Sequence, residues 1–193
     1  DSAEGALSKH PRNMTEEMLK AVANGPRGGG VVMVNFYSAF VDEDFRKAYG
    51  AMAKDREEAS KALDEKLKAE HADVKTRAIE EHKVSEEWAA KVPRPPLSAL
   101  IDHIDHIAKV AGIDHVGLGS DFDGIPQSPA GIDSAADLPK ITAAPVQRGY
   151  NAQQIHKILG GNFLRLFAQV ARVAHHIHKA SPTMAAVPTH PAN

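Results

Sequence analysis

The sequence predicts an α/β fold with a parallel sheet, and two apolar segments with a helix between them carry this expectation. Residues 31–37 are apolar on both faces, which is typical of a parallel strand covered by helices. Residues 115–120 form a second such segment, and residues 97–111 have the apolar spacing of an amphipathic helix. Strand, helix and strand in this order are the unit of a parallel sheet.

The composition limits the class of protein and its partners. The 193 residues are enough for one domain with a core, and 23 Lys and Arg against 25 Asp and Glu give a net charge of −2. This balance provides no basic field for nucleic acid, so we expect no nucleic-acid partner. The absence of cysteine excludes disulfides, thiolate zinc sites and a cysteine nucleophile.

The first elements are a short helix and a strand, followed by a charged region. Residues 13–16, Asn-Met-Thr-Glu, have capping-box spacing and predict a helix that ends at residues 24–26, Asn-Gly-Pro. The strand of residues 31–37 follows. Residues 51–88 are dense in charged residues and alanine, with a thin apolar stripe, which predicts an exposed helical excursion with a solvated face.

The second half contains the remaining helices. Residues 93–96, Pro-Arg-Pro-Pro, end the charged region before the amphipathic helix of residues 97–111. After the second strand, residues 125–145 predict a polar, proline-containing loop. Asn151 and Gln154 predict the cap of a last helix that carries apolar residues as far as Val170, and an unstructured tail is expected after residue 179.

The most informative segment is the end of the second strand, where Asp121 and Asp123 enter a turn that closes at Gly124. Gly117 and Gly119 alternate with apolar residues in that strand, which predicts an unusually close approach of neighbouring backbone. The segment lacks the ligand pattern of an EF-hand, and the chain has no phosphate-binding glycine loop. On spacing alone a structural Asp-Gly turn is favoured over a catalytic carboxylate, and the position after a strand narrows the difference between these two interpretations.

Other polar residues have weaker functional interpretations. His103 and His106 are three residues apart on a helix, but their positions around its axis disfavour a shared metal ion. The histidines near the end of the chain, at positions 175, 176 and 178, predict adventitious metal binding only. Arg12, which follows His10-Pro11, could hold a carboxylate in a bidentate manner, and the alternative is a solvated side chain.

Taken together, five segments resemble the C-terminal part of the membrane (renal) dipeptidase family, peptidase family M19. They occur in the family order and cover most of the chain between residues 10 and 170, with the charged excursion and the tail outside the match. The segments are His10-Pro-Arg-Asn13, Gly30-Val-Val-Met-Val-Asn-Phe-Tyr37, Asp102-His-Ile-Asp-His-Ile107, His115-Val-Gly-Leu-Gly-Ser-Asp-Phe-Asp-Gly124 and Ile158-Leu-Gly-Gly-Asn-Phe-Leu-Arg165.

The resemblance implies a (β/α)8 barrel of the metal-dependent hydrolase kind, with its active site at the carboxyl ends of the strands. It implies hydrolysis of dipeptides with two zinc ions. Asp121 matches the aspartate that handles protons, Arg12 matches the arginine that holds the substrate's carboxylate, and Tyr37 is expected to line the substrate pocket. No residue of this sequence matches the family's metal ligands, which lie upstream of the first matching segment in the family.

The resulting hypothesis is a zinc-dependent dipeptidase of which this chain is the C-terminal portion, with the N-terminal part of the barrel and a dipeptide as partners. Residues 1–172 are expected to belong to the barrel domain, with the excursion at 51–92, and residues 173–193 to a tail. The alternative is a non-catalytic, metal-free binding or assembly module. Two strands cannot close a barrel, so their open edges favour association, including formation of a homo-oligomer.

Overall fold

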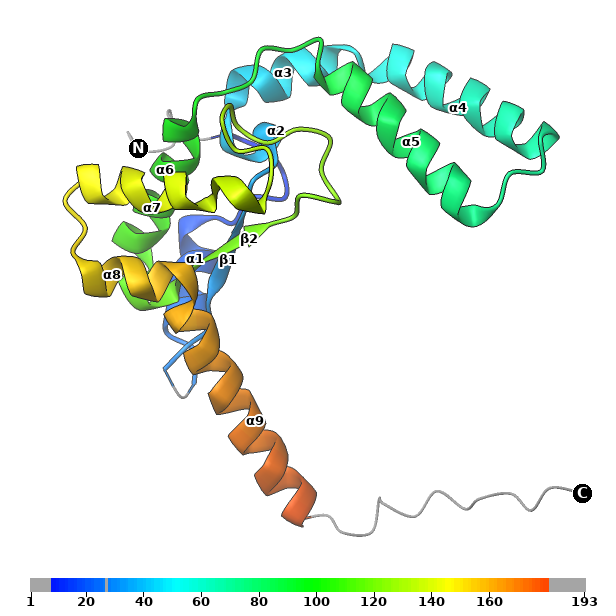
Figure 1. Ribbon diagram of the computed structural model, residues 1–193. Coiled ribbons are helices and arrows are strands. Elements are labelled where there is room, and N and C mark those ends of the chain that lie inside the picture. Colours follow the sequence, from blue (N-terminus) through cyan, green and yellow to red (C-terminus); the bar gives the residue numbers. More distant parts are fainter. Residues whose placement is uncertain (1–7, 27, 181–193) are drawn as a thin grey trace, which may run out of the picture.

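A computed structural model describes residues 8–26 and 28–180 of the chain. Two parallel strands lie at the centre, and helices surround them (Figure 1). Strand β1 is Val32–Asn35 and strand β2 is Val116–Ser120. The predicted arrangement of strand, helical connection and parallel strand is therefore confirmed, although both strands are shorter than expected.

The pairing of the two strands explains why β2 has a glycine at position 119. Val32 pairs with Val116 and Val34 with Leu118, but Asn35 pairs with Ser120, so the register shifts at the end of β1. A Cβ atom on Gly119 would lie 3.1 Å from the backbone oxygens of Met33 and Val34. The predicted close approach of the two backbones is confirmed at this position.

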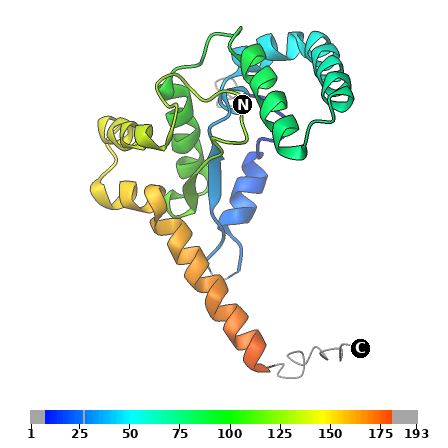
Figure 2. The ribbon, with the colours of Figure 1, turned by 45° about the vertical axis from the view of Figure 1, so that its right-hand side comes forward.

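The main core lies between the sheet and helices α1 (Glu16–Ala23) and α6 (Leu97–Val110), which lie beside the sheet in Figure 2. The predicted capping box at Asn13 is wrong. Thr15 is the N-cap of α1, because its hydroxyl accepts from the Met18 N–H at 3.3 Å. The buried side chains that join the strands to these helices include Leu19, Val34, Phe36, Leu100, Ile101, Ile104 and Val116.

Between β1 and α6 the chain forms the predicted charged helical excursion. Helices α2 (Ser38–Val41) and α3 (Glu43–Ala51) lead into α4 (Ala53–Ala69) and α5 (Val74–Ala89), which project from the body as a hairpin (Figure 1). A second, smaller core closes the base of this hairpin. Its buried residues are Ala39, Phe45, Tyr49, Ala89 and Val92.

The segment after β2 differs from the prediction. The loop expected over residues 125–145 contains the 3-10 turn η2 (Ala135–Asp137) and most of helix α7 (Leu138–Gln147). The two prolines of this helix lie in different positions. Pro139 occupies the first turn, where no N–H is needed, whereas Pro145 lies inside the helix, near its end, and removes one intrahelical hydrogen bond.

The predicted cap of the last helix is confirmed, because Asn151 and Gln154 form both hydrogen bonds of a capping box. The helix is not continuous, however. Helix α8 (Ala152–His156) passes through a kinked π-type segment, η3 (Lys157–Gly161), into α9 (Asn162–Ala180). Helix α9 runs through residue 172, where the barrel domain was expected to end, and the unstructured tail predicted after residue 179 lies, from residue 181 onward, outside the described residues.

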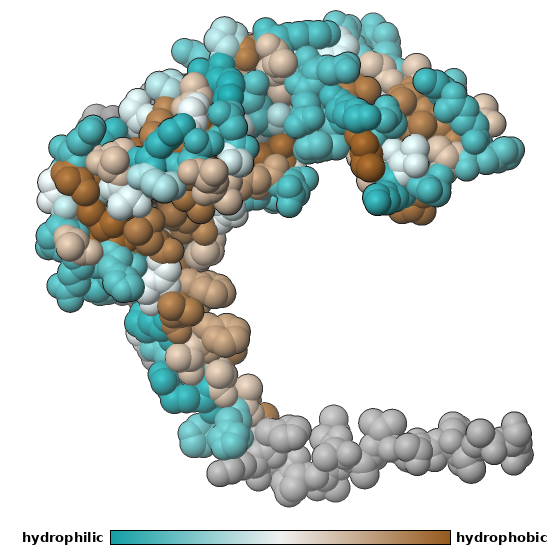
Figure 3. Space-filling view, viewed as in Figure 1, coloured by the Kyte–Doolittle hydropathy of each residue, from teal (hydrophilic) through white to brown (hydrophobic). Residues whose placement is uncertain are grey.

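Helix α9 extends away from the body and carries exposed apolar side chains (Figures 1 and 3). They are Phe163, Leu164, Phe167, Val170 and Ile177. Within the described part of the chain, no helix combines the length and the hydropathy that crossing a membrane requires.

Candidate functional site

Asp121 lies directly after β2, and its side chain meets the end of β1. The Asn35 side-chain amide donates to Asp121 Oδ2 at 2.8 Å. Asp121 is exposed to solvent, and this contact with the neighbouring strand orients one of its two carboxylate oxygens. The structure therefore places a carboxylate at the carboxyl edge of a parallel sheet, where α/β proteins position functional groups.

The backbone at this turn has left-handed geometry. Ser120 and Asp121 have φ values of 35° and 72°, although neither is glycine. The Gly124 N–H donates to the Asp121 carbonyl at 3.0 Å, and a Cβ on Gly124 would lie 2.3 Å from Asp121 Oδ1. Such costly conformations in residues other than glycine cluster at functional sites. Gly124 is needed here because its missing side chain leaves space for the carboxylate.

Asn35 is the residue of this site that sequence reasoning missed. Its Oδ1 accepts from the Tyr37 backbone N–H at 2.8 Å, while its amide group donates to Asp121. Two backbone hydrogen bonds join the same segments, from Phe36 to the Ser120 carbonyl at 3.1 Å and from Ser38 to the Gln127 carbonyl at 2.9 Å. The sequence feature that could have identified Asn35 is a polar residue at the end of an apolar strand.

Tyr37 packs in an aromatic group beside this turn. Its ring centroid lies 5.0 Å from that of Phe40, and the rings of Phe45 and Tyr49 follow at 6.4 and 6.5 Å. Burial raises the pKa of Tyr37 to about 12, and Tyr49 adds to this effect while Arg56 opposes it. The phenol is therefore neutral at physiological pH and can donate a hydrogen bond.

Arg12 also contacts Phe40. Its guanidinium carbon lies 5.2 Å from the Phe40 ring centroid, which is a cation–π contact, and the side chain is exposed. Asn13 fixes the local backbone by donating to the carbonyls of Ser8 and Phe40, both at 2.8 Å. No carboxylate among the described residues pairs with Arg12, which leaves its hydrogen-bond donors available.

The three residues predicted from the sequence thus lie along one series of contacts. Asp121 contacts Asn35, Asn35 binds the Tyr37 backbone, and Phe40 contacts both Tyr37 and Arg12. This arrangement has a carboxylate at one end, a cation at the other and an aromatic surface between them. It can recognise a ligand that carries a carboxylate and can transfer a proton.

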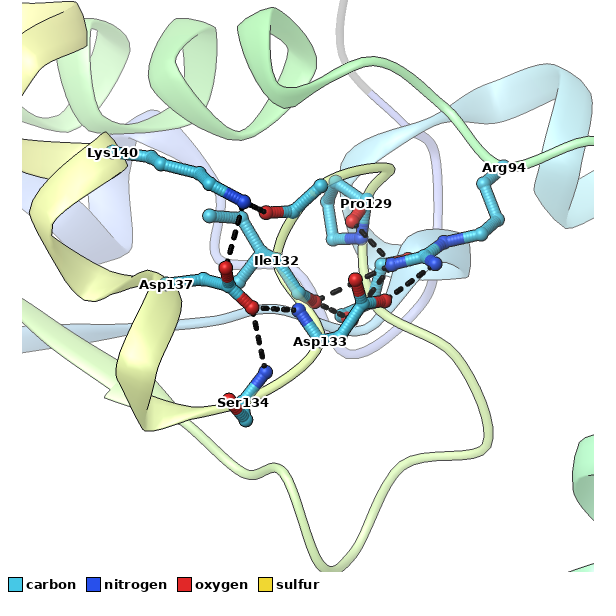
Figure 4. Close-up of polar contacts among 9 residues, drawn as sticks. Arg94, Pro129, Ile132, Asp133, Ser134, Asp137 and Lys140 are labelled. Atoms are coloured by element: carbon cyan, nitrogen blue, oxygen red, sulfur yellow. Dashed lines mark hydrogen bonds and ion pairs between the residues drawn. The ribbon is translucent and has the colours of Figure 1, made fainter.

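Arg94 anchors the loop that continues from this turn (Figure 4). Its guanidinium donates to the carbonyls of Ser128 and Pro129 at 2.9 and 2.7 Å and pairs with Asp133 at 2.6 Å. Lys140 adds a contact to the Gly131 carbonyl at 2.8 Å. The loop is therefore fixed on its downstream side as well as at Asp121.

His103 and His115 contact backbone carbonyls. His103 Nε2 lies 3.2 Å from the Val41 carbonyl, and since that oxygen can only accept, the ring nitrogen donates. His115 Nδ1 contacts the Gly30 carbonyl at 2.8 Å, at the opposite end of the strands from Asp121. The exposed rings of His175 and His176 lie 6.3 Å apart on α9.

The residues present do not fit a zinc centre. Within residues 8–26 and 28–180, no three or more His, Asp or Glu side chains are grouped closely enough to hold a metal ion. The acidic residues Asp102 and Asp105 instead bind Arg148 Nη1, each at 2.5 Å. We derive no chemical step through a metal from these residues.

Comparison with known proteins identifies the family that this chain resembles. The family model for membrane dipeptidase, peptidase family M19, matches residues 1–181. The chain is 31% identical over 173 residues to dipeptidase ataJ of Aspergillus terreus, a match that covers 90% of this chain and 30% of that relative. The chain therefore spans about a third of the length of this relative.

Two solved structures are similar to this chain in fold. The probable dipeptidase PvdM from Pseudomonas aeruginosa is 25% identical, with a TM-score of 0.56 over 83% of this chain and 41% of that protein. A metallopeptidase from Rhodobacter sphaeroides, solved with a phosphinate mimic of the dipeptide L-Ala-D-Ala, is 23% identical, with a TM-score of 0.53 over 82% of this chain and 31% of that one. With the family match extending over nearly its whole length, this chain belongs to the membrane dipeptidase family, peptidase family M19.

Proposed function

We propose that this chain supplies the proton-transfer group and the carboxylate-binding group of a dipeptidase active site. Family membership supports the reaction, hydrolysis of a dipeptide. The observation that carries the proposal is the Asp121 carboxylate, held 2.8 Å from Asn35 at the carboxyl edge of the sheet and joined through Tyr37 and Phe40 to the exposed Arg12.

In this proposal Asp121 acts as general base and then as general acid. Its carboxylate accepts a proton from the water that attacks the peptide carbonyl. It returns the proton to the amide nitrogen as the C–N bond breaks, so that the leaving group departs as a neutral amine. A carboxylate with one oxygen held by Asn35 suits both steps, because the exposed side chain remains accessible to the attacking water.

Arg12 and Tyr37 bind the substrate in this proposal. A guanidinium recognises a carboxylate through two parallel hydrogen bonds, so Arg12 would hold the terminal carboxylate of the dipeptide. The Tyr37 ring would form a wall of the pocket. Its neutral phenol is compatible with an apolar substrate side chain.

The family resemblance implies two zinc ions, whose chemistry would be to activate the attacking water. Because the described residues do not fit a metal centre, residues outside them would provide the metal ligands. A partner segment would likewise provide the remaining strands of a (β/α)8 barrel.

Asp121→Asn in the full-length, metal-loaded protein tests the central role. We expect kcat for a simple dipeptide to fall by about 10²- to 10⁴-fold with KM nearly unchanged, because the amide cannot accept the proton. The matched control is Asp123→Asn, since Asp123 is an exposed carboxylate in the same turn. Equal losses of kcat in the two variants would contradict a specific role for Asp121.

Arg12 is tested by its effect on KM. Arg12→Ala should raise KM by about 10- to 100-fold, the value of a charge-assisted contact of ~1.5–3 kcal/mol, with a smaller change in kcat. Arg12→Lys should recover part of this loss, because lysine keeps the charge without the bidentate geometry. An unchanged KM in Arg12→Ala would exclude the proposed contact.

The same experiments distinguish the proposal from a non-catalytic assembly module. The zinc content and dipeptide hydrolysis of the full-length protein should both be positive. Absence of both zinc and hydrolysis in the full-length protein would favour the metal-free module.

A further inference from the structure

The geometry points to Asn35 as a positioning residue that holds the Asp121 carboxylate in its working orientation, an inference that rests on the proposed function. The two residues lie on neighbouring strands, with Asn35 at the end of β1 and Asp121 after β2. Their side chains are joined by the 2.8 Å hydrogen bond from the Asn35 amide to Asp121 Oδ2.

The orientation of the Asn35 amide is fixed by its second contact. The Tyr37 backbone N–H can only donate, so the Asn35 atom that faces it at 2.8 Å must be the carbonyl oxygen. The NH2 group then points at Asp121, which as a carboxylate can only accept. The two contacts therefore require the same amide orientation.

The strand register supports this function. Asn35 pairs with Ser120 rather than with Gly119, so the extra residue in β2 brings the ends of the two strands into the offset that joins Asn35 to Asp121. Irregularities of this kind redirect side chains next to active sites. Asp121 Oδ1 faces Gly124, where a Cβ would lie only 2.3 Å away. One oxygen is thus held by Asn35, while the space for the other depends on glycine.

A purely structural role is the competing explanation, because Asn35 also satisfies the Tyr37 N–H. The two explanations differ in what happens when Asp121 is absent. A positioning residue acts through Asp121, so its removal should have no further effect on kcat once Asp121 is removed. A structural residue should lower kcat by the same factor in either background.

The test is a double-mutant cycle on kcat and KM in the full-length, metal-loaded protein. We expect Asn35→Ala to lower kcat by about 10- to 100-fold, the usual effect of losing a supporting partner, with less than about a twofold change in KM. In the Asp121→Ala background, the same substitution should change kcat by less than about twofold. Asn151→Ala, which removes a cap on α8, is the control and should leave kcat unchanged.

Asn35→Asp provides a second variant if Asn35→Ala does not fold. It keeps an oxygen for the Tyr37 N–H and replaces the donor to Asp121 with a second, negatively charged carboxylate oxygen, so it should show at least the same loss of kcat and the same non-additivity. Equal effects of either Asn35 substitution with and without Asp121 would overturn the inference. If Asp121→Ala itself leaves kcat unchanged, the proposed function has failed, and the inference fails with it.

Discussion

At the scale of single residues, the geometry of the Asp121 turn depends on the glycine three positions later. Gly124 has no side chain, and a Cβ there would meet Asp121 Oδ1 at 2.3 Å and Cγ at 3.1 Å. Because the neighbouring atoms belong to the Asp121 carboxylate, any adjustment moves that group. The requirement for glycine at this position therefore concerns the site as well as the turn.

We predict that Gly124→Ala lowers kcat of the full-length protein by on the order of 10- to 100-fold, since displacement of a reacting group by about 1 Å has costs of this size. Steady-state hydrolysis of a dipeptide measures the effect. Gly50→Ala is the control, because a Cβ on Gly50 in α3 has no neighbour within 4 Å. An unchanged kcat in Gly124→Ala would mean that the carboxylate tolerates displacement.

His103 makes stability depend on pH. Burial lowers the pKa of His103, with a smaller contribution from His106, while the Val41 carbonyl and Asp102 act in the opposite direction. The unfolded chain therefore binds the proton at a higher pH than the folded chain does. The contribution of His103 to the free energy of unfolding is fully present above the pKa of the unfolded chain, about 6.5. It is lost as the pH falls through this value toward the lower pKa of the folded chain.

We expect His103→Gln to make the unfolding free energy less dependent on pH below about 6.5, because glutamine can donate to the Val41 carbonyl without titrating. Urea unfolding at a series of pH values between about 5 and 8 measures this dependence. Identical slopes for both proteins would show that His103 does not cause the loss of stability in acid.

At the scale of elements, Asn162 links the last helix to the sheet. Its side chain is 2% exposed and donates to the carbonyls of Ile113 at 2.7 Å and Val116 at 2.8 Å, just before and at the start of β2. A buried carbonyl without a donor is costly, and this amide satisfies two of them. Asn162 therefore fixes the beginning of α9 against the amino end of β2.

We predict that Asn162→Ala lowers the free energy of unfolding by about 2–4 kcal/mol, because both carbonyls lose their donor. Asn151→Ala, which removes only the exposed cap of α8, should cost about 1 kcal/mol. Urea unfolding of the two variants with equal m-values makes the comparison. A cost at Asn162 no larger than at Asn151 would contradict the linking role.

Elements with a strong local pattern could be predicted, while those set by distant contacts could not. The spacing of apolar residues identified α6, and the Asn151 and Gln154 pair identified the start of α8. The prolines of α7 suggested a loop, because composition does not reveal that Pro139 occupies the first turn of a helix and that Pro145 is tolerated near its end. Asn13 had the residue type of a cap, but its amide binds the Ser8 and Phe40 carbonyls, the latter far along the chain.

In the candidate site, too, features with a local sequence pattern differ from those set by distant contacts. Asp121 was identified from its place after an apolar strand, whereas Asn35 lies 86 positions away along the chain and meets it only through the strand register. The series that joins Tyr37, Phe40 and Arg12 also depends on tertiary packing. Individual candidate residues could be chosen from the sequence. Their contacts could not, because they depend on the parallel pairing of β1 and β2.

At the scale of the whole molecule, the hairpin of α4 and α5 is separate from the site. Its helices pack on each other, with Leu67 buried and Asp64 paired with Arg77, and most of its other ion pairs are exposed. Its base is held by Arg56, whose guanidinium lies 3.8 Å from the Tyr49 ring centroid. The distal part of the hairpin should therefore contribute little to the stability of the body.

We predict that replacing residues 58–85 with a flexible Gly-Ser linker leaves the unfolding midpoint of the body nearly unchanged. Exposed ion pairs contribute about 0–1 kcal/mol each, and the cost of closing a loop changes only slowly with its length. Trp88, the single tryptophan, lies at the base beside Lys91 and reports unfolding by fluorescence. Phe45→Ala, which removes a buried ring from the small core, is the contrasting variant and should cost about 3–5 kcal/mol. If the deletion lowered stability as much as Phe45→Ala does, the hairpin would be an integral part of the fold rather than an excursion from it.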